Sequence, residues 1–499
     1  MQQLNKQYLT ETLKKPYYGD RPERVIQFGE GGFLRAFFDY MLDTANEKGV
    51  FDGSVIVVKP IAYGTMENFE KQDNVYTLIE RGISGDKEVS RSRVISSISR
   101  VVGAYENYDE LLKCAAIPTL RFLVSNTTEA GIAYVDTDKF DDAPPSSYPA
   151  KLTRFLYERF QVFGGAADKG MILMPCELIE DNGSNLKKCV LQYADLWNLS
   201  GEFKSWLENS CKFCNTLVDK IVTGYPRGDA DKLEQELGYH DALLDTTELF
   251  TFWAVEADQS VAKELPLAEA GFNVLFTDKL QYYRNRKVYI LNGIHTATSL
   301  AAYLSGFDFV GDFMNDPTFY RYVDQMVNTE ILPTIKPVND EIRQFAADVL
   351  ERFRNKYLNH MLLSISLNSV SKWKTRCLPT ILRYMEDNKA LPKNLTFSFA
   401  ALIAFYLGSF KDGAYTGTRP GNDYQIKDND DILRYFDSVG AKLRSNEISV
   451  SELVADVCAK TGYWGQNLNE LKDFAPTVSR HLEKILNSSM TEAVKELVS

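Results

Sequence analysis

The first half of the chain alternates short apolar runs with segments of helical periodicity. A run over residues 24–28 (RVIQF) leads into a cluster of glycines, and residues 33–48 then place apolar side chains at helical spacing. Further apolar runs cover residues 54–59, 120–125, 171–174 and 273–276. Short apolar strands separated by helices are typical of a parallel sheet covered on both faces. The pattern therefore predicts an α/β domain.

The second half carries a different pattern. From about residue 288 onward, helical periodicity dominates and strand-like runs nearly vanish. Helices are predicted over residues 288–304, 321–334, 339–356, 357–370, 395–409, 451–458 and 478–498. The segment 411–431 is rich in Gly, Asp and Asn, which predicts an exposed loop. We place the boundary near residue 285, with an α/β domain over residues 1–285 and a mostly α-helical domain over residues 286–499.

Composition and charge narrow the class of protein. The chain has 499 residues, of which 44% are hydrophobic and 25% charged, so it is globular rather than disordered. Its length favours two domains, because one core rarely grows past about 250–300 residues. The net charge of −12 argues against a nucleic-acid or anionic-membrane partner, since phosphate binding needs a basic face. A small anionic ligand stays possible where cations gather locally.

Targeting signals and cysteines point to a soluble, cytoplasmic protein. Residues 1–20 lack the apolar core of a secretory signal. The most apolar stretch, residues 395–410, is shorter than the roughly 20 residues that span a bilayer. The seven scattered cysteines fit reduced thiols better than a disulfide framework. We expect a monomer or a small homo-oligomer.

A glycine-rich turn follows the first predicted strand. The sequence GEGGFLRAF begins at Gly29, where Gly29 would form the turn and Gly31 would let a pyrophosphate approach the helix N-terminus. Leu34 stands in place of the usual third glycine, and a turn without a ligand is the alternative. The second strand ends in Lys59-Pro60 rather than in an acid that accepts ribose hydroxyls. Because Lys59 could attract a 2′-phosphate, these residues leave NAD and NADP open.

Lys287, Asn292 and His295 begin the helical half, with apolar residues between them. On an α-helix, Asn292 lies about 140° and His295 about 80° from Lys287, so all three can face one cleft. An apolar setting disfavours the charged amine, so we expect the pKa of Lys287 to fall toward a range useful for proton transfer. Asn292 could donate to a developing oxyanion and His295 could bind the same oxygen. The set suits alcohol–ketone interconversion without a metal, although each residue taken singly has an ordinary structural explanation.

Longer segments carry a resemblance to a known family. The turn GEGGFLRAF, the segment SNTTEAGI (residues 125–132), the run DDAPPSSYPAKLTRFLYERF (residues 141–160) and the K-x4-N-x2-H helix resemble the polyol-specific long-chain dehydrogenases, the mannitol dehydrogenase family. The segments PCELIEDNG, NTLVDKIVTGYPR, ELGYHD and FRNKYLNHMLLSISLN are similar to one member of that family, which acts on a keto-hexuronate. The likeness extends from about residue 23 to residue 494.

The resemblance implies a reaction and a division of labour. The reaction is the reversible, NADH-dependent and metal-independent reduction of D-tagaturonate to D-altronate, a step in hexuronate (galacturonate) breakdown. The first domain would bind NAD in a Rossmann-type fold, and the second would bind substrate. Lys287 would act as general acid in reduction and as base in oxidation. Asn292, helped by a second asparagine, would form the oxyanion site, and His295 would contact the substrate.

The remaining site residues are also assigned through the resemblance. The cofactor side comprises the glycine turn, the end of the second strand and the SNTT segment: Phe28, Gly29, Gly31, Gly32, Phe33, Lys59, Asn126 and Thr127. On the substrate side, Asp219 and Lys372 fall on family positions that contact the polyol chain.

Two departures from the family pattern affect these assignments. The usual S-x-D-N segment reads PCEL at residues 175–178, so we assign Asn182 as the second oxyanion asparagine. The arginine that polyol enzymes carry eight residues before Lys372 is Ser364 here. We therefore expect Lys372, Lys374 or Arg376 to hold the substrate carboxylate.

Other interpretations stay open. The chain could be a related fructuronate reductase or mannitol dehydrogenase, or a non-catalytic nucleotide-binding regulator that has kept the fold. A zinc enzyme is suggested by Cys211-x-x-Cys214, but no second Cys or His pair stands at ligand spacing in the sequence.

Overall fold

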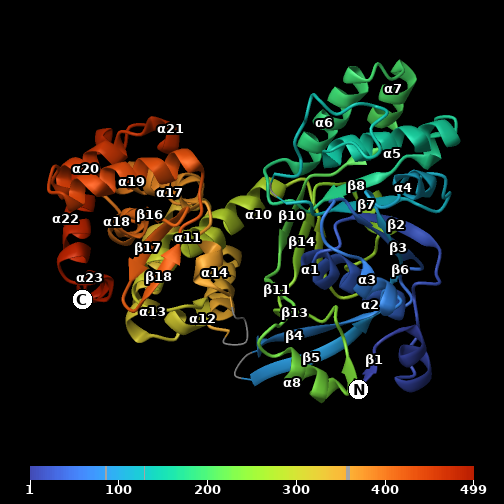
Figure 1. Ribbon diagram of the computed structural model, residues 1–499, viewed down its shortest axis with the longest axis horizontal. Helices are drawn as coiled ribbons and strands as arrows, with labels where there is room; N and C mark the ends of the chain where they lie inside the picture. The colour runs from blue at the N-terminus through green and yellow to red at the C-terminus, as the bar shows by residue number, and fades with distance from the viewer. Residues whose placement is uncertain (85–86, 129, 356–359) are drawn as a thin grey trace. The chain divides into compact units, whose positions relative to one another are not determined.

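The protein divides into two compact units. The computed structural model describes residues 1–84, 87–128, 130–355 and 360–499. Unit 1 comprises Met1–Tyr283 and unit 2 comprises Arg284–Ser499 (Figure 1). Two of the segments that carry the family resemblance, SNTTEAGI and FRNKYLNHMLLSISLN, extend over residue 129 and residues 356–359, which lie outside the described residues.

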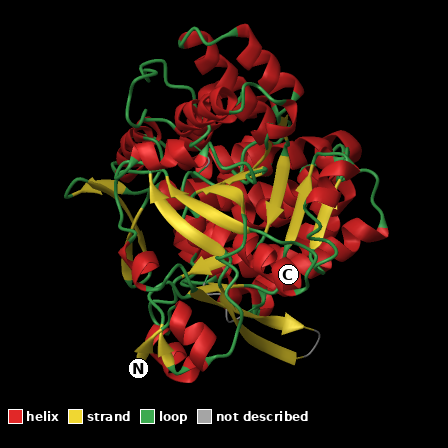
Figure 2. Ribbon diagram, turned by 90° about the vertical axis from the view of Figure 1, so that its right-hand side faces the viewer, coloured by secondary structure: helices red, strands yellow, loops and turns green. Residues whose placement is uncertain are grey.

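Unit 1 is built on a six-stranded parallel sheet, which confirms the α/β prediction (Figure 2, strands yellow). Its strand order is β6-β3-β2-β7-β8-β9. The strands are β6 (Ile98–Gly103), β3 (Ser54–Lys59), β2 (Glu23–Phe28), β7 (Phe122–Ser125), β8 (Ile172–Pro175) and β9 (Lys212–Phe213). Strand order reverses at β2, so the carboxyl ends of β2 and β7 flank the crevice where such sheets bind ligands.

Both faces of this sheet are buried. Successive residues along a strand point to opposite faces, and those on each face pack in a different apolar cluster. Val25 and Val57 pack with residues of α2, whereas Ile26 and Val58 pack with residues of α5, α6 and α7. Figure 1 shows α5, α6 and α7 on one side of β7 and β8, with α2 and α3 on the other. The helices of unit 1 are η1 (Tyr8–Thr12), α1 (Gly32–Leu34), η2 (Arg35–Asp39), α2 (Tyr40–Glu47), α3 (Glu67–Lys71), α4 (Tyr108–Cys114), α5 (Tyr148–Val162), η3 (Ala167–Lys169), α6 (Asn182–Leu196), α7 (Gly201–Asn209), α8 (Ala230–Leu237) and α9 (Gln259–Glu264).

Smaller sheets complete unit 1. The predicted strand at residues 273–276 forms, but it pairs with β14 in a separate three-stranded sheet rather than in the main one. The sheets are β10 (Thr216–Asp219), β14 (Phe252–Val255) and β15 (Asn273–Phe276); β11 (Val222–Gly224), β13 (Asp245–Thr247), β4 (Tyr76–Ser84) and β5 (Lys87–Ile95); and β1 (Gln2–Gln3) with β12 (Tyr239–His240). Apart from β15, these strands were not predicted. Most have four residues or fewer, so few positions alternate, but β4 and β5 have nine residues each.

Unit 2 is mainly helical, as predicted. Its helices are η4 (Val288–Asn292), which continues α10 (Leu280–Lys287), then α11 (Gly293–Leu304), α12 (Val310–Met314), α13 (Pro317–Gln325), η5 (Met326–Ile331), η6 (Leu332–Thr334), α14 (Asp340–Phe353), α15 (Leu362–Ile365), α16 (Ser369–Arg376), α17 (Leu378–Asn388), α18 (Lys393–Tyr406), α19 (Asp430–Arg444), α20 (Val450–Cys458), α21 (Thr461–Trp464), η7 (Leu468–Glu470), α22 (Phe474–Asn487) and α23 (Met490–Val498). Among the described residues, no helix is both long enough and apolar enough to cross a bilayer.

Two sequence predictions for unit 2 were wrong. The segment predicted as a loop forms an antiparallel sheet of β16 (Ser409–Lys411), β17 (Ala414–Arg419) and β18 (Asn422–Gln425). Its tight turns contain Asp412-Gly413, both with positive φ, and its alternate residues Tyr415 and Arg419 are buried. The helix predicted over residues 357–370 is not continuous in its described part, because Asn368 adopts a left-handed conformation between α15 and α16.

Candidate active site

The glycine turn has the geometry that a dinucleotide needs. Gly29 follows β2 with φ of +123°, and a Cβ there would lie 2.8 Å from the carbonyl oxygen of Asn126. A Cβ at Gly31 would meet nothing within 4 Å, so this side of the turn is open. A continuous helical run over α1, η2 and α2 begins at Gly32, and its first N–H groups have no intrahelical partners. These features fit a bound pyrophosphate.

The neighbours of the turn are mostly buried in the protein. Phe28 is buried with its ring 5.2 Å from that of Tyr148, and Phe33 stacks on Phe37 at 5.2 Å. A Cβ at Gly32 would lie 2.9 Å from Oδ2 of Asp245. Phe28 and Phe33 therefore shape the turn through packing, and Gly32 is a glycine because the Asp245 carboxylate lies against it.

A buried glutamate organises the segment that follows β7. The Thr127 N–H and hydroxyl both donate to Oε1 of Glu177 at 2.9 Å, and the Ser125 hydroxyl donates to Oε2 at 3.1 Å. The Asn126 N–H donates to the Phe28 carbonyl at 3.0 Å. Burial raises the pKa of Glu177, while these donors oppose the rise. Glu177 was not among the predicted site residues, although it occupies the aspartate position of the family's S-x-D-N segment.

Lys59 is engaged with the protein itself. Its buried ammonium donates to the carbonyls of Ile61 at 2.9 Å and Tyr63 at 3.3 Å, and it lies 2.7 Å from Oε1 of Glu106. These three acceptors match the three N–H donors of a lysine. The suggestion that Lys59 attracts a 2′-phosphate is therefore not supported by its surroundings.

A π-helical turn separates Lys287 from Asn292. Lys287 ends α10 and is 7% exposed, and η4 then runs from Val288 to Asn292. Because a π-turn bonds residue i to residue i+5, five residues make slightly more than one turn. Asn292 therefore lies nearer the face of Lys287 than the α-helical estimate of about 140°. Such turns are frequent at functional sites.

His295 lies in a buried, electropositive setting. Its ring stacks on Phe353 at 4.0 Å and 9°, and its Nε2 is buried without a hydrogen-bond partner among the described residues. Burial lowers the pKa of His295 well below its usual value, and His360, Arg376, Arg352 and Lys372 lower it further. The histidine is thus neutral, and its orphaned nitrogen can bind a ligand hydroxyl.

The cations near His295 come from two helices. Lys372 and Arg376 lie on α16, and Arg352 lies at the end of α14. The Lys372 ammonium donates to the Ile365 carbonyl at 3.0 Å, and Arg376 donates to the Thr296 hydroxyl at 3.4 Å. Lys372 and Arg376 were predicted from the sequence, whereas Arg352, Phe353 and His360 were not. Phe353 and His360 begin and end the FRNKYLNH segment, and Arg352 directly precedes it.

Two other predicted residues lie in unit 1. Asn182 is buried, and its amide nitrogen lies within hydrogen-bond distance of the carbonyls of Pro175, Glu177 and Thr216, at 2.9, 3.1 and 3.2 Å. Its amide oxygen accepts from the Gly183 and Thr216 N–H groups. Both amide hydrogens are thus committed to backbone, which removes Asn182 as an oxyanion donor. Asp219 is buried at the end of β10.

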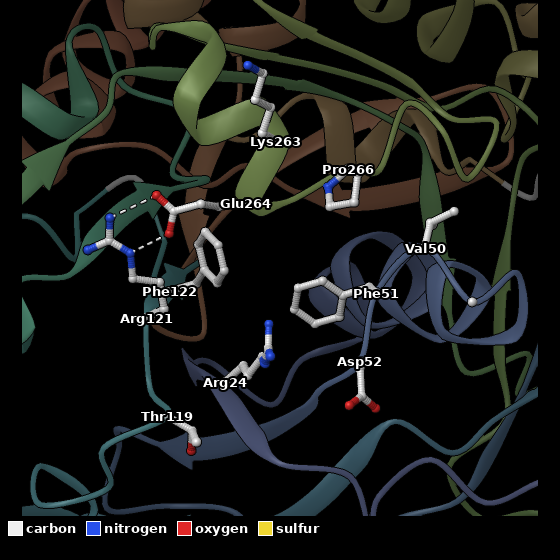
Figure 3. Close-up of a pocket in the computed structure, with 11 residues that line it drawn as sticks. Arg24, Val50, Phe51, Asp52, Thr119, Arg121, Phe122, Lys263, Glu264 and Pro266 are labelled. Atoms are coloured by element: carbon white, nitrogen blue, oxygen red, sulfur yellow. Dashed lines mark hydrogen bonds and ion pairs between the residues drawn. The ribbon is translucent and has the colours of Figure 1, made fainter. Parts of the chain in front are cut away.

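A cavity of about 430 Å³ lies elsewhere on unit 1 (Figure 3). It is lined by Arg24, near the start of β2, and by Arg121, directly before β7. Figure 3 shows the Arg121 guanidinium paired with Glu264. The cavity therefore lies at the amino ends of the strands, opposite the carboxyl ends that carry the glycine turn.

The cysteines have no metal-site arrangement in the described structure. All seven are buried and unpaired, and burial raises the pKa of Cys211 and Cys214 to about 12. Among the described residues, no three His, Cys, Asp or Glu side chains are grouped for a metal ion. The C-x-x-C pair consists of core thiols flanking β9.

Comparison with known proteins identifies the class. The Mannitol dehydrogenase Rossmann domain matches residues 23–269, and the Mannitol dehydrogenase C-terminal domain matches residues 279–486. The chain belongs to the mannitol dehydrogenase family, a family of oxidoreductases, which confirms the resemblance found in the sequence.

Particular relatives are similar over nearly the whole chain. Altronate oxidoreductases of Escherichia coli O6:K15:H31 (strain 536 / UPEC) and O7:K1 (strain IAI39 / ExPEC) are 46% identical over 477 residues, covering 95% of this chain and 97% of each relative. The fold is that of Pseudomonas fluorescens mannitol 2-dehydrogenase, solved with NAD and D-mannitol (TM-score 0.78, 23% identity, 99% of both chains). A substrate-free D-sorbitol dehydrogenase shares it (TM-score 0.76, 21% identity, 97% of this chain and 96% of the other).

Proposed function

We propose that this protein catalyses the reversible, NADH-dependent and metal-independent reduction of D-tagaturonate to D-altronate. The observation that carries the proposal is the setting of His295 on the helical run that also bears Lys287 and Asn292. A neutral histidine with an orphaned nitrogen suits a sugar hydroxyl, and the cations near it suit a carboxylate. A keto-hexuronate carries both groups. The 46% identity to altronate oxidoreductases supports the same substrate.

Five residues of unit 2 carry out this chemistry. Lys287 gives a proton to the carbonyl oxygen during reduction and takes it back during oxidation. The Asn292 amide donates to the negative charge that develops on that oxygen. His295 holds a substrate hydroxyl through Nε2, and Lys372 and Arg376 hold the carboxylate.

The residues of unit 1 bind the cofactor. The bound nicotinamide supplies the hydride that reduces the carbonyl carbon. The turn at Gly29 and Gly31 holds the pyrophosphate against the helix N-terminus, next to Phe28, Gly32 and Phe33. Asn126, whose amide donates to the Cys176 carbonyl, and Thr127, held by Glu177, form the neighbouring wall.

Further parts of the proposal follow from the family assignment. Asp219 contacts the polyol chain, as the matching position does in the family. The enzyme is cytoplasmic and takes a small-molecule substrate, with no nucleic-acid or membrane partner. It is a monomer or a small homo-oligomer.

An assay over several keto sugars tests the substrate. NADH oxidation is followed with D-tagaturonate, D-fructuronate and D-fructose, and then repeated with NADPH. We expect the highest kcat/KM with D-tagaturonate and NADH. A higher value with D-fructuronate or D-fructose would reassign the substrate within the family. Tight NADH binding without turnover of any of the three would favour the non-catalytic regulator.

A further inference from the structure

The second strand of the Rossmann sheet lacks the acid that usually reads the adenosine ribose. In dinucleotide-binding folds that acid stands at the carboxyl end of the strand after the glycine turn. Here the strand is β3, which ends at Lys59, and its neighbour β6 ends at Gly103, directly opposite Lys59 in the register. Residues that follow β6 therefore emerge beside the place where the acid is missing.

Glu106 brings a carboxylate to that place. Its Oε1 lies 2.7 Å from the Lys59 ammonium, whose side chain is fully buried, while the Glu106 side chain is 43% exposed. A Cβ at Gly103 would lie 2.1 Å from Oε2 of Glu106, so the carboxylate folds back over the last residue of β6. No hydrogen bond to Oε2 is found among the residues that the structure describes, which leaves this oxygen as a half-exposed acceptor.

The local charge disfavours the 2′-phosphate of NADP. Glu30, the middle residue of the glycine turn, lies close enough to respond to both partners of the pair. Burial raises its pKa, Lys59 and Arg35 lower it, and Glu106 raises it. Arg35 is itself paired with Asp245 and donates to the Leu243 carbonyl. Apart from the Arg35–Asp245 pair, the cluster contains two carboxylates and one lysine whose N–H donors are already engaged. A 2′-phosphate would meet net negative charge and no free donor from Lys59, and bringing like charges together is unfavourable.

We propose that Glu106 is the residue that selects NAD over NADP, by accepting a hydrogen bond from the adenosine ribose and by repelling a 2′-phosphate. The inference rests on the proposed use of NADH and deepens it. Lys59, which the sequence offers as a phosphate anchor, instead holds the Glu106 carboxylate in position. The acid therefore comes from the loop after β6, whereas the usual acid stands at the end of the strand that corresponds to β3.

Nucleotide binding to Glu106→Gln tests this role without any turnover. Dissociation constants for NADH and NADPH are measured by fluorescence titration of wild type, E106Q and D109N. Glutamine keeps an acceptor for Lys59 but removes the charge, and Asp109 is an exposed carboxylate close by in the sequence. We expect E106Q to lower the NADH-over-NADPH preference at least about tenfold, equivalent to about 1.4 kcal/mol, and D109N to leave it unchanged.

The outcomes separate this inference from the proposed reaction. A preference in E106Q within about threefold of wild type, or an equal shift in D109N, overturns the role of Glu106, whatever the substrate assay shows. A shift confined to E106Q supports it even if D-tagaturonate is not reduced. If E106Q melts well below wild type, the double variant Lys59→Met with E106Q removes the buried charge together with its partner, and the same loss of preference is expected.

Discussion

Replacing Lys287 tests proton transfer most directly, provided that the replacement preserves packing. The lysine is 7% exposed, so its aliphatic stem is buried with the ammonium. Alanine would remove about three methylenes, which at about 0.8 kcal/mol each is about 2.4 kcal/mol of burial. A loss of that size could disturb the π-turn and move Asn292. Methionine keeps nearly the same length and removes only the amine, so Lys287→Met isolates the chemistry.

We expect kcat of Lys287→Met to fall by about 10²–10⁴, the usual contribution of positioned proton transfer. At about 1.36 kcal/mol per tenfold, this is a loss of about 2.7–5.4 kcal/mol of transition-state stabilisation. The NADH dissociation constant and Tm should stay near the wild-type values. In the oxidation direction, the wild-type rate should rise with pH because the base must be neutral, and the variant should lose that rise.

The measurement is steady-state kcat in both directions across pH, together with an NADH titration and a thermal melt. Lys279→Met is the matched control, since Lys279 is exposed just before α10. Activity of Lys287→Met within about tenfold of wild type would refute the acid–base role. Rescue of Lys287→Ala by a small primary amine, which fits the space left by the stem, would support it.

Three further changes have expected outcomes. Asn292→Ala should lower kcat by about 10²–10³ with unchanged NADH affinity, because an oxyanion donor acts only in the transition state. Gly29→Ala should weaken NADH binding and lower Tm, because φ is +123° and the new Cβ would lie 2.8 Å from the Asn126 carbonyl. Burial lowers the pKa of His481 to about 4, so the stability it contributes is present above its usual value of 6.5 and is lost as pH falls toward 4. His481→Leu should therefore reduce acid destabilisation by about 1–2 kcal/mol.

Each of these has an outcome that would contradict it. A kcat of Asn292→Ala within about threefold of wild type would remove the oxyanion role. Unchanged NADH binding in Gly29→Ala would show that the turn does not hold the cofactor. Gly201→Ala, at the start of α7 and with nothing within 4 Å of its new Cβ, is the control for a change of side chain alone. For His481→Leu, denaturant unfolding at pH 7 and pH 4.5 decides: an equal loss of stability in variant and wild type on acidification would exclude the histidine as its source.

Local patterns in the sequence predicted much of the fold and part of the site. The run RVIQF, the glycines after it and the helical spacing of residues 33–48 predict strand, turn and helix, because backbone hydrogen bonding and side-chain periodicity depend on near neighbours. The same holds for Lys287, Asn292 and His295, whose spacing places them on one helical run. The sheet at residues 409–425 was missed because Gly and Asp occur both in loops and in tight hairpin turns.

The amino-acid sequence by itself determined the α/β and helical halves, the glycine turn and the Lys-Asn-His helix. Only the tertiary structure decided what surrounds each side chain. It buries the Lys59 ammonium against Glu106, commits both amide hydrogens of Asn182 to backbone, and stacks His295 on Phe353 among cations. The physical reason is that burial and electrostatic environment arise from segments far apart in the chain, whereas periodicity arises within one segment.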